Sequence, residues 1–109
     1  QLPDLAGVTA LGFSQGSQTV ARWAARTNRR IDHVILWGGG LPQEIEPGPG
    51  MFGGARVTLV AGERDRFAAG AIDRLAQSLE AADVACKVEY FRGGHRLDDE
   101  TLRRIAASA

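Results

Sequence analysis

The sequence predicts an α/β fold, in which a mostly parallel sheet of about four strands lies between layers of helices in a three-layer sandwich. Two observations lead to this prediction. Short apolar runs typical of strands alternate with longer segments whose apolar residues recur at helical spacing. The two middle runs are almost continuously apolar, which is typical of strands buried on both faces of a parallel sheet. Strand–helix–strand order with right-handed crossovers makes the strands parallel and places helices over the sheet.

The individual elements follow from the same pattern. The apolar runs place strands at residues 8–13, 34–37, 57–61 and 87–91. A first helix is expected at about residues 16–27, and a second at about 69–82, where Ile72, Ala76 and Leu79 repeat at helical spacing. A third helix follows Asp98 or Asp99, either of which can cap its N-terminus.

Composition limits the class of protein. The chain has 109 residues, enough for one domain spanning residues 1–109, and its 13 basic and 13 acidic residues cancel. We therefore expect no electrostatic attraction to nucleic acid or to an anionic membrane. No apolar run approaches the roughly 20 residues of a membrane span and no signal peptide is visible, so a cytoplasmic protein is expected. The single cysteine, Cys86, excludes an internal disulfide.

Residues 12–16, Gly-Phe-Ser-Gln-Gly, are the most informative feature of the sequence. This Gly-x-Ser-x-Gly pattern lies between a predicted strand and a predicted helix, which is the context of a nucleophile elbow that exposes a serine hydroxyl above the sheet edge. The helix passes close to the strand in such a turn, and Gly12 and Gly16 supply the small residues needed there. Ser14 is therefore the candidate nucleophile. A helix N-cap at Ser14 is the alternative.

His95 is the candidate general base. It lies in a glycine-rich loop directly after the last predicted strand, at the sheet edge where a catalytic loop is expected. The other histidine, His33, precedes the strand at 34–37, at the opposite end of the sheet from Ser14, and we interpret it as a solvated loop residue. The alternative for His95 is also a surface loop position.

Asp65 is the candidate acid, because it leaves the C-terminal end of the strand at 57–61. The order Ser14, Asp65, His95 is the order in which α/β-hydrolases carry their triads. Other interpretations stay open: Glu63 in the same loop, Asp98 or Asp99 later in the chain, or a surface ion pair of Asp65 with Arg64 and Arg66.

These residues resemble the C-terminal half of the phospholipase/carboxylesterase family of α/β-hydrolases, which includes acyl-protein thioesterase-like enzymes. The resemblance spans most of residues 5–106 and rests on residues 12–16, 24–26, 30–36, 62–65 and 93–95. It implies that Ser14 is the nucleophile, Asp65 the acid and His95 the base of a catalytic triad. Ser17 departs from the family, which usually has another glycine there. The N-terminal half of the family's domain has no counterpart in the sequence, so we expect a partial domain that lacks the N-terminal strands.

The partial domain has two expected consequences. An α/β-hydrolase oxyanion hole uses the backbone N–H after the nucleophile, here that of Gln15, and a second N–H from a loop after an earlier strand. Loss of one donor costs on the order of 10²–10³ in turnover, so the chain alone is expected to be an impaired esterase. The strand at 8–13 also has an unpaired edge, which we expect to pair with a second copy or with a missing N-terminal segment.

The connection between the second and third strands is rich in glycine and proline, which excludes a stable helix through much of it. A long loop at the C-terminal edge of a parallel strand is a place where a substrate pocket is lined. Leu41, Met51 and Phe52 are therefore the candidate apolar lip for an acyl chain. A linker with incidental apolar residues is the alternative.

The function expected from the sequence is cleavage of small-molecule carboxylic esters or thioesters by a serine hydrolase, through an acyl-enzyme and without a metal or organic cofactor. Two alternatives remain. The first is a non-catalytic hydrolase-like fragment or association module that lacks a complete oxyanion hole. The second keeps the triad for a different reaction, as in a peptidase or an acyltransferase.

Overall fold

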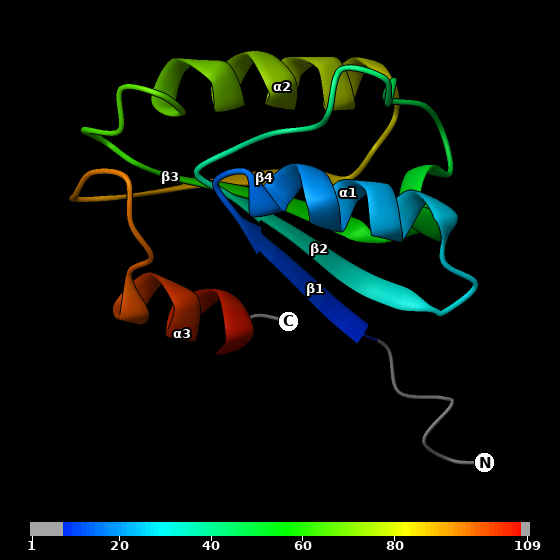
Figure 1. The fold of residues 1–109 in the computed structure, drawn as a ribbon, viewed down its shortest axis with the longest axis horizontal. Helices are drawn as coiled ribbons and strands as arrows, with labels where there is room; N and C mark the ends of the chain where they lie inside the picture. Colours follow the sequence, from blue (N-terminus) through cyan, green and yellow to red (C-terminus); the bar gives the residue numbers. More distant parts are fainter. Residues whose placement is uncertain (1–7, 108–109) are drawn as a thin grey trace.

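The computed structural model describes residues 8–107, in which parallel strands alternate with helices (Figure 1). The elements follow in the order β1 (Val8–Phe13), α1 (Gly16–Arg26), β2 (Ile31–Trp37), the short 3-10 helix η2 (Met51–Gly54), β3 (Arg56–Gly62), α2 (Ala69–Ala81), β4 (Cys86–Phe91) and α3 (Asp99–Ala107). The four strands pair in parallel in the order β1-β2-β3-β4. The predicted α/β class is confirmed.

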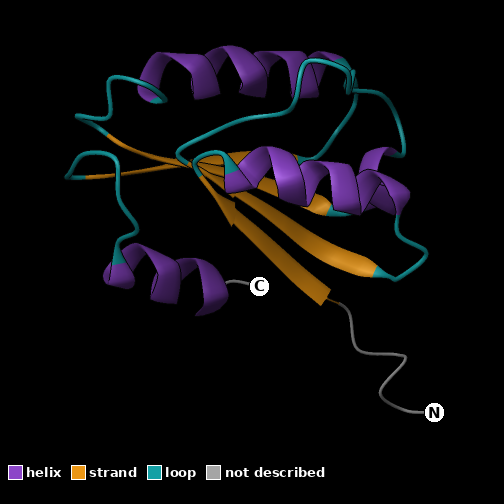
Figure 2. Ribbon diagram, viewed as in Figure 1, coloured by secondary structure: helices purple, strands orange, loops and turns teal. Residues whose placement is uncertain are grey.

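The helices cover the two faces of the sheet unequally (Figure 2). Helices α1 and α2 pack on one face, where Ala21 of α1 and Leu79 of α2 are buried in the larger hydrophobic core. Helix α3 packs on the other face, where Ile105 is buried against Trp37 and Phe91. These layers form the predicted three-layer sandwich.

The burial of the strands follows their position in the sheet. Strands β2 and β3 lie in the middle, and all but one residue of each is buried, as their nearly continuous apolar sequence predicts. Strands β1 and β4 lie at the edges and keep partly exposed residues. The outer edge of β1 pairs with no other strand in residues 8–107.

Strand β2 begins at Ile31, three residues earlier than expected, and this corrects the interpretation of His33 as a solvated loop residue. A β-bulge between β1 and β2 leaves Asp32 without a partner in β1. The bulge changes the alternation of side chains, so that Ile31 joins the core with Val34 while His33 points to the other face. His33 is only 3% exposed, and its Nε2 lies 2.6 Å from the Thr58 hydroxyl oxygen.

Asp98 caps helix α3, as one of the two expected caps. Its Oδ2 accepts hydrogen bonds from the backbone N–H of Thr101 at 3.0 Å and from the Thr101 hydroxyl at 2.6 Å. These bonds, with a smaller contribution from Arg96, hold the pKa of the Asp98 carboxyl below its usual value. Asp98 is therefore committed to the helix, which removes it as a candidate acid for His95.

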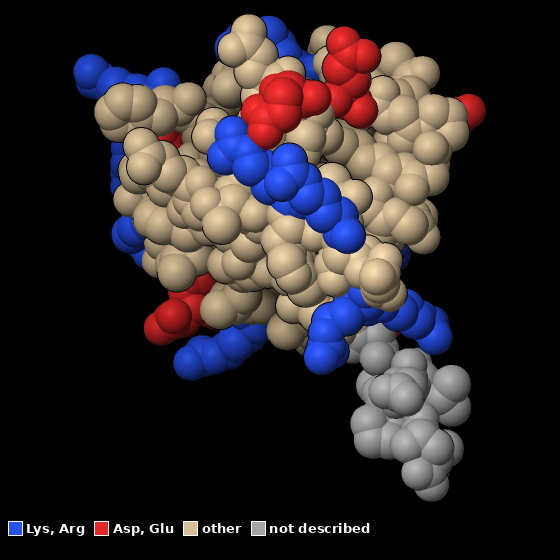
Figure 3. Space-filling model, turned by 45° about the vertical axis from the view of Figure 1, so that its right-hand side comes forward, with Lys and Arg blue, Asp and Glu red and all other residues tan. Residues whose placement is uncertain are grey.

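The face drawn in Figure 3 has no large patch of basic or of acidic side chains alone. Positive and negative side chains are spread over that face, with wide uncharged areas between them. None of the three α-helices in residues 8–107 has the length and apolar character needed to cross a bilayer.

Burial of His33 makes the stability of the fold depend on pH. Burial first, and the charge of Arg56 second, lower the pKa of His33 below its usual value of 6.5. Between pH 6.5 and the lower pKa of the folded state, His33 is protonated in the unfolded chain but not in the folded chain. The folded state is therefore most stable, with respect to His33, above pH 6.5. As the pH falls below 6.5, its free energy of unfolding decreases by at most about 1.4 kcal/mol per pH unit.

We expect His33→Gln to flatten this pH dependence, because glutamine does not titrate. Urea denaturation of both proteins at intervals from pH 8 to pH 5 measures the effect. All other side chains are the same in both proteins, so the difference between the two slopes reports His33. Equal slopes for the two proteins below pH 6.5 would contradict the assignment.

Candidate active site

Ser14 lies in a strained turn between β1 and α1. Its φ of 58° is in the left-handed region, which is rare for residues other than glycine and costs free energy. The turn is fixed by a hydrogen bond of 2.7 Å from the Ser14 N–H to the Trp37 carbonyl at the end of β2. The Ser14 side chain is not an N-cap, because its hydroxyl contacts His95 and Gln15 occupies the capping position of α1. The geometry is that of a nucleophile elbow.

The two glycines of the elbow differ in what they require. A Cβ on Gly12 would lie 2.3 Å from the Gly16 carbonyl oxygen, so only glycine fits where α1 crosses β1. A Cβ on Gly16 would meet no described atom within 4 Å. The expectation that both glycines are needed for close packing is therefore wrong for Gly16. Its backbone carbonyl contacts Gly12, but a side chain at position 16 would have room.

Ser17 stabilises the elbow through hydrogen bonds that the sequence did not indicate. The side chain is fully buried, and its hydroxyl donates to the Gly12 carbonyl at 3.0 Å, with the Trp37 carbonyl at 3.4 Å. The hydroxyl thus satisfies acceptors at the ends of β1 and β2. The departure from glycine at this position adds a buried hydrogen bond.

Three side chains predicted from the sequence are joined by two hydrogen bonds. His95 Nε2 lies 2.9 Å from Ser14 Oγ, and His95 Nδ1 lies 2.7 Å from Asp65 Oδ2. An ionised carboxylate only accepts hydrogen bonds, so Nδ1 carries the proton and Nε2 is left as the acceptor for the Ser14 hydroxyl. The imidazole side chain is 31% exposed, while the Asp65 side chain is almost completely buried.

Asp65 is oriented by its own loop. Its Oδ1 accepts the backbone N–H groups of Phe67 at 3.0 Å and Ala68 at 3.3 Å, which leaves Oδ2 to His95. The residue is 2% exposed, so the alternative of a surface ion pair with the neighbouring arginines is wrong. Glu63 is exposed at the surface, and the carboxylate that contacts His95 is that of Asp65.

Backbone contacts join the loop that carries Asp65 to the loop that carries His95. The N–H of Arg64 donates to the Gly93 carbonyl at 2.8 Å. A Cβ on Gly62 would lie 2.3 Å from that same carbonyl oxygen, so the two loops meet without room for a side chain. The indole N–H of Trp37 donates to the Arg96 carbonyl at 2.9 Å and fixes the far side of the His95 loop.

Aromatic rings and a glycine enclose the imidazole of His95. The ring of Phe13 lies 5.0 Å from it and the ring of Phe67 lies 5.7 Å from it, centroid to centroid. A Cβ on Gly38, whose φ is 67°, would lie 3.1 Å from His95 Cε1. The imidazole is therefore held in place by packing as well as by its two hydrogen bonds.

The backbone N–H of Gln15 is available as an oxyanion donor. It precedes the first turn of α1, where the helix dipole favours negative charge, and it donates no hydrogen bond within residues 8–107. Within the same residues no three His, Cys, Asp or Glu side chains gather as a metal site requires.

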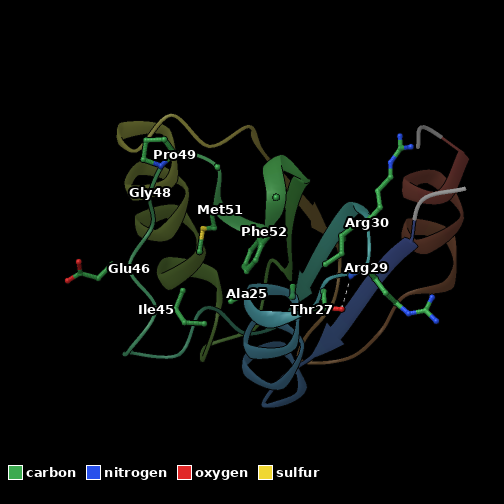
Figure 4. Close-up of a pocket in the computed structure, with 14 residues that line it drawn as sticks. Ala25, Thr27, Arg29, Arg30, Ile45, Glu46, Gly48, Pro49, Met51 and Phe52 are labelled. Atoms are coloured by element: carbon green, nitrogen blue, oxygen red, sulfur yellow. Dashed lines mark hydrogen bonds between the residues drawn. The ribbon is translucent and has the colours of Figure 1, made fainter. Parts of the chain in front are cut away.

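Two residues of the predicted apolar lip of Leu41, Met51 and Phe52, namely Met51 and Phe52, do not lie beside Ser14. Met51 and Phe52 line a cavity of about 430 Å³ together with Thr27, at the end of α1, where β2 begins (Figure 4). Phe52 is buried in the core, and Leu41 packs against the same core. The physical reason is topological: β3 is parallel to β2, so the connection must return to the opposite edge of the sheet and carries residues 51–54 away from Ser14.

Comparison with known proteins supports the fold. No family model and no curated protein matches the chain. A protein of unknown function from Agrobacterium tumefaciens is similar over 94% of this chain and 52% of its own, with 28% identity and a TM-score of 0.62. A carboxylesterase from Bacillus cereus is 19% identical over 93% of this chain and 48% of its own, with a TM-score of 0.70. Esterase PE8 is 18% identical over 92% of this chain and 47% of its own, with a TM-score of 0.72.

These likenesses show that the chain has an α/β-hydrolase fold and spans about half the length of the solved structures that it matches.

The two elbow glycines supply a matched pair of variants. We expect Gly12→Ala to lower the free energy of unfolding by about 1–3 kcal/mol, because its Cβ collides with backbone that cannot move aside. Gly16→Ala adds a Cβ in open space within a helix, and we expect no loss and a gain of up to about 1 kcal/mol. Urea denaturation of the three proteins measures both values. Equal losses in the two variants would contradict the packing described for the elbow.

Proposed function

We propose that the chain is a serine hydrolase that cleaves carboxylic esters or thioesters through an acyl-enzyme. Ser14 is the nucleophile, His95 the general base and Asp65 the residue that orients the imidazole. The observation that carries the proposal is the continuous set of hydrogen bonds from Ser14 Oγ to His95 Nε2 and from His95 Nδ1 to Asp65 Oδ2. The likeness of the fold to esterases supports ester cleavage in particular.

The reaction begins with attack by the serine. Ser14 Oγ forms a bond to the carbonyl carbon of the substrate while His95 Nε2 takes the hydroxyl proton. The carbonyl oxygen becomes an oxyanion, which the Gln15 N–H and the N-terminal end of α1 stabilise. The tetrahedral intermediate then collapses, and the imidazolium of His95 gives its proton to the leaving oxygen or sulfur.

Hydrolysis of the acyl-enzyme repeats these steps with water. His95 takes a proton from the water molecule as it attacks the Ser14 ester, and the acid is released as the proton returns to Ser14 Oγ. Asp65 holds the Nδ1–H tautomer through both halves of the reaction and stabilises the charged imidazolium. The backbone N–H groups that bind Asp65 Oδ1 keep the carboxylate in place.

The second oxyanion donor is assigned to a segment that pairs with β1. The outer edge of β1 has no strand partner in residues 8–107, and Ser14 directly follows this strand. The chain also spans only about half of the esterases that it resembles. We therefore take residues 1–109 to be one half of a hydrolase domain, whose free edge accepts a further strand.

A second candidate function is a non-catalytic association module. The observation that favours it is the same free edge of β1, because exposed strand edges pair readily with other chains. In this alternative the three hydrogen-bonded side chains would have no substrate. Turnover that depends on Ser14 separates the two functions.

We expect Ser14→Ala to abolish hydrolysis of a short p-nitrophenyl ester by the chain. Asp65→Asn is expected to lower kcat by a factor on the order of 10⁴, because the amide favours the wrong imidazole tautomer. Initial rates of p-nitrophenol release measure both effects. Ser78→Ala is the matched control, because Ser78 is an exposed serine on α2 whose hydroxyl contacts only the Arg74 carbonyl. Hydrolysis that survives Ser14→Ala would exclude the proposed nucleophile.

The free edge predicts association of the isolated chain. We expect light scattering to detect dimers or larger species at high concentration, and Thr9→Lys to shift the chain to monomers, because a charge on an edge strand opposes pairing. Thr9 is exposed on β1, and the exposed Gln18 on α1 supplies the control Gln18→Lys. A chain that remains monomeric at every concentration would contradict pairing of this edge with a second copy.

A further inference from the structure

Phe67 is an aromatic side chain that contacts His95 and yet lies open to solvent. It is 83% exposed, the highest value among the three large apolar side chains that are exposed in residues 8–107. Its ring meets the imidazole of His95 edge to face, at 5.7 Å between centroids. Most of the surface of the ring is thus available to another molecule beside the imidazole of His95.

The ring is attached to a rigid part of the loop. The Phe67 N–H donates to Asp65 Oδ1 at 3.0 Å, and the next residue, Ala68, is buried and donates to the same oxygen at 3.3 Å. The backbone on both sides of the ring is therefore fixed by the carboxylate that orients His95. A ring held in this way contributes contact area at a low cost in entropy.

The chemistry of acyl transfer determines which part of a substrate reaches this ring. The proton that His95 Nε2 takes from Ser14 must pass to the leaving oxygen or sulfur, which therefore comes within hydrogen-bond distance of Nε2. In the proposed reaction the carbonyl oxygen points instead toward the Gln15 N–H. The substituent of the leaving atom consequently extends over the groups around His95, and the acyl chain extends elsewhere.

We propose that Phe67 forms the wall of a leaving-group subsite and selects esters or thioesters whose alcohol or thiol part is apolar. This inference rests on the proposed serine hydrolase function. In the step concerned, the bond between the acyl carbon and the leaving oxygen breaks, the acyl group stays on Ser14 Oγ, and the His95 proton goes to that oxygen. The released alcohol leaves past the ring of Phe67.

The test compares ethyl butanoate with hexyl butanoate in one reaction mixture. The two alcohols have nearly the same acidity, and both esters give the same butanoyl-enzyme, so a difference in kcat/KM reports contacts of the alcohol during acylation. Competition in one tube also makes the ratio independent of the absolute rate. We expect the chain to prefer the hexyl ester, and Phe67→Ala to reduce the ratio of the two kcat/KM values by about tenfold.

Three controls make the result specific. Phe67→Leu keeps an apolar side chain and is expected to retain most of the preference. Trp23→Ala removes an exposed aromatic ring from α1 and is expected to leave the preference unchanged. The preference for ethyl hexanoate over ethyl butanoate, which varies the acyl chain, is expected to be the same in Phe67→Ala as in the original chain.

Two results would overturn the inference. If Phe67→Ala keeps the hexyl preference, or loses the acyl preference instead, the leaving-group subsite is wrong while the hydrolase function stands. If the unaltered chain shows no hydrolysis that depends on Ser14, the proposed function fails and the subsite fails with it. Thermal unfolding of each variant verifies that the fold is retained, as the exposure of Phe67 predicts.

Discussion

The hydrogen bond between His95 Nδ1 and Asp65 Oδ2 is the interaction on which the rest of the site depends. It joins two loops that leave neighbouring parallel strands, β3 and β4, at the same edge of the sheet. The loops are held together beneath it by the bond from Arg64 to the Gly93 carbonyl, and the absence of a side chain at Gly62 permits this close approach. In the orientation fixed by this bond, Nε2 lies 2.9 Å from Ser14 Oγ.

The parallel sheet explains which residues meet and which do not. Each strand delivers its C-terminal loop to one edge, so Ser14, Asp65 and His95 converge although they are separated by up to 81 residues. The same topology sends the connection after β2 back to the opposite edge, where η2 packs beside the end of α1. The apolar ring that lies beside His95 instead comes from a loop at the first edge, the one that carries Phe67.

Sequence patterns predicted most of the fold because the apolar periodicity of strands and helices is local. The start of β2 was missed, since the bulge at Asp32 breaks the alternation and conceals the buried position of His33. The three side chains at the candidate site were predicted from strand order and chain order. The bonds from Trp37 to the His95 loop and from Ser17 to Gly12 were not, because a tryptophan or serine in a sequence gives no indication of its distant acceptor. Met51 and Phe52 were predicted to lie beside Ser14 because the loop that carries them begins at that edge of the sheet. A loop between parallel strands has to end at the opposite edge, and these two residues lie near its end.

Nitrogen-15 NMR of His95 in the folded chain tests the bond to Asp65 most directly, because it reports which ring nitrogen carries the proton. We expect neutral His95 to be almost entirely the Nδ1–H tautomer and its Nδ1 proton to exchange slowly with water, and we expect both features to be lost in Asp65→Asn. A mixture of tautomers with rapid proton exchange, as in a solvated histidine, would show that the bond to Asp65 is not formed.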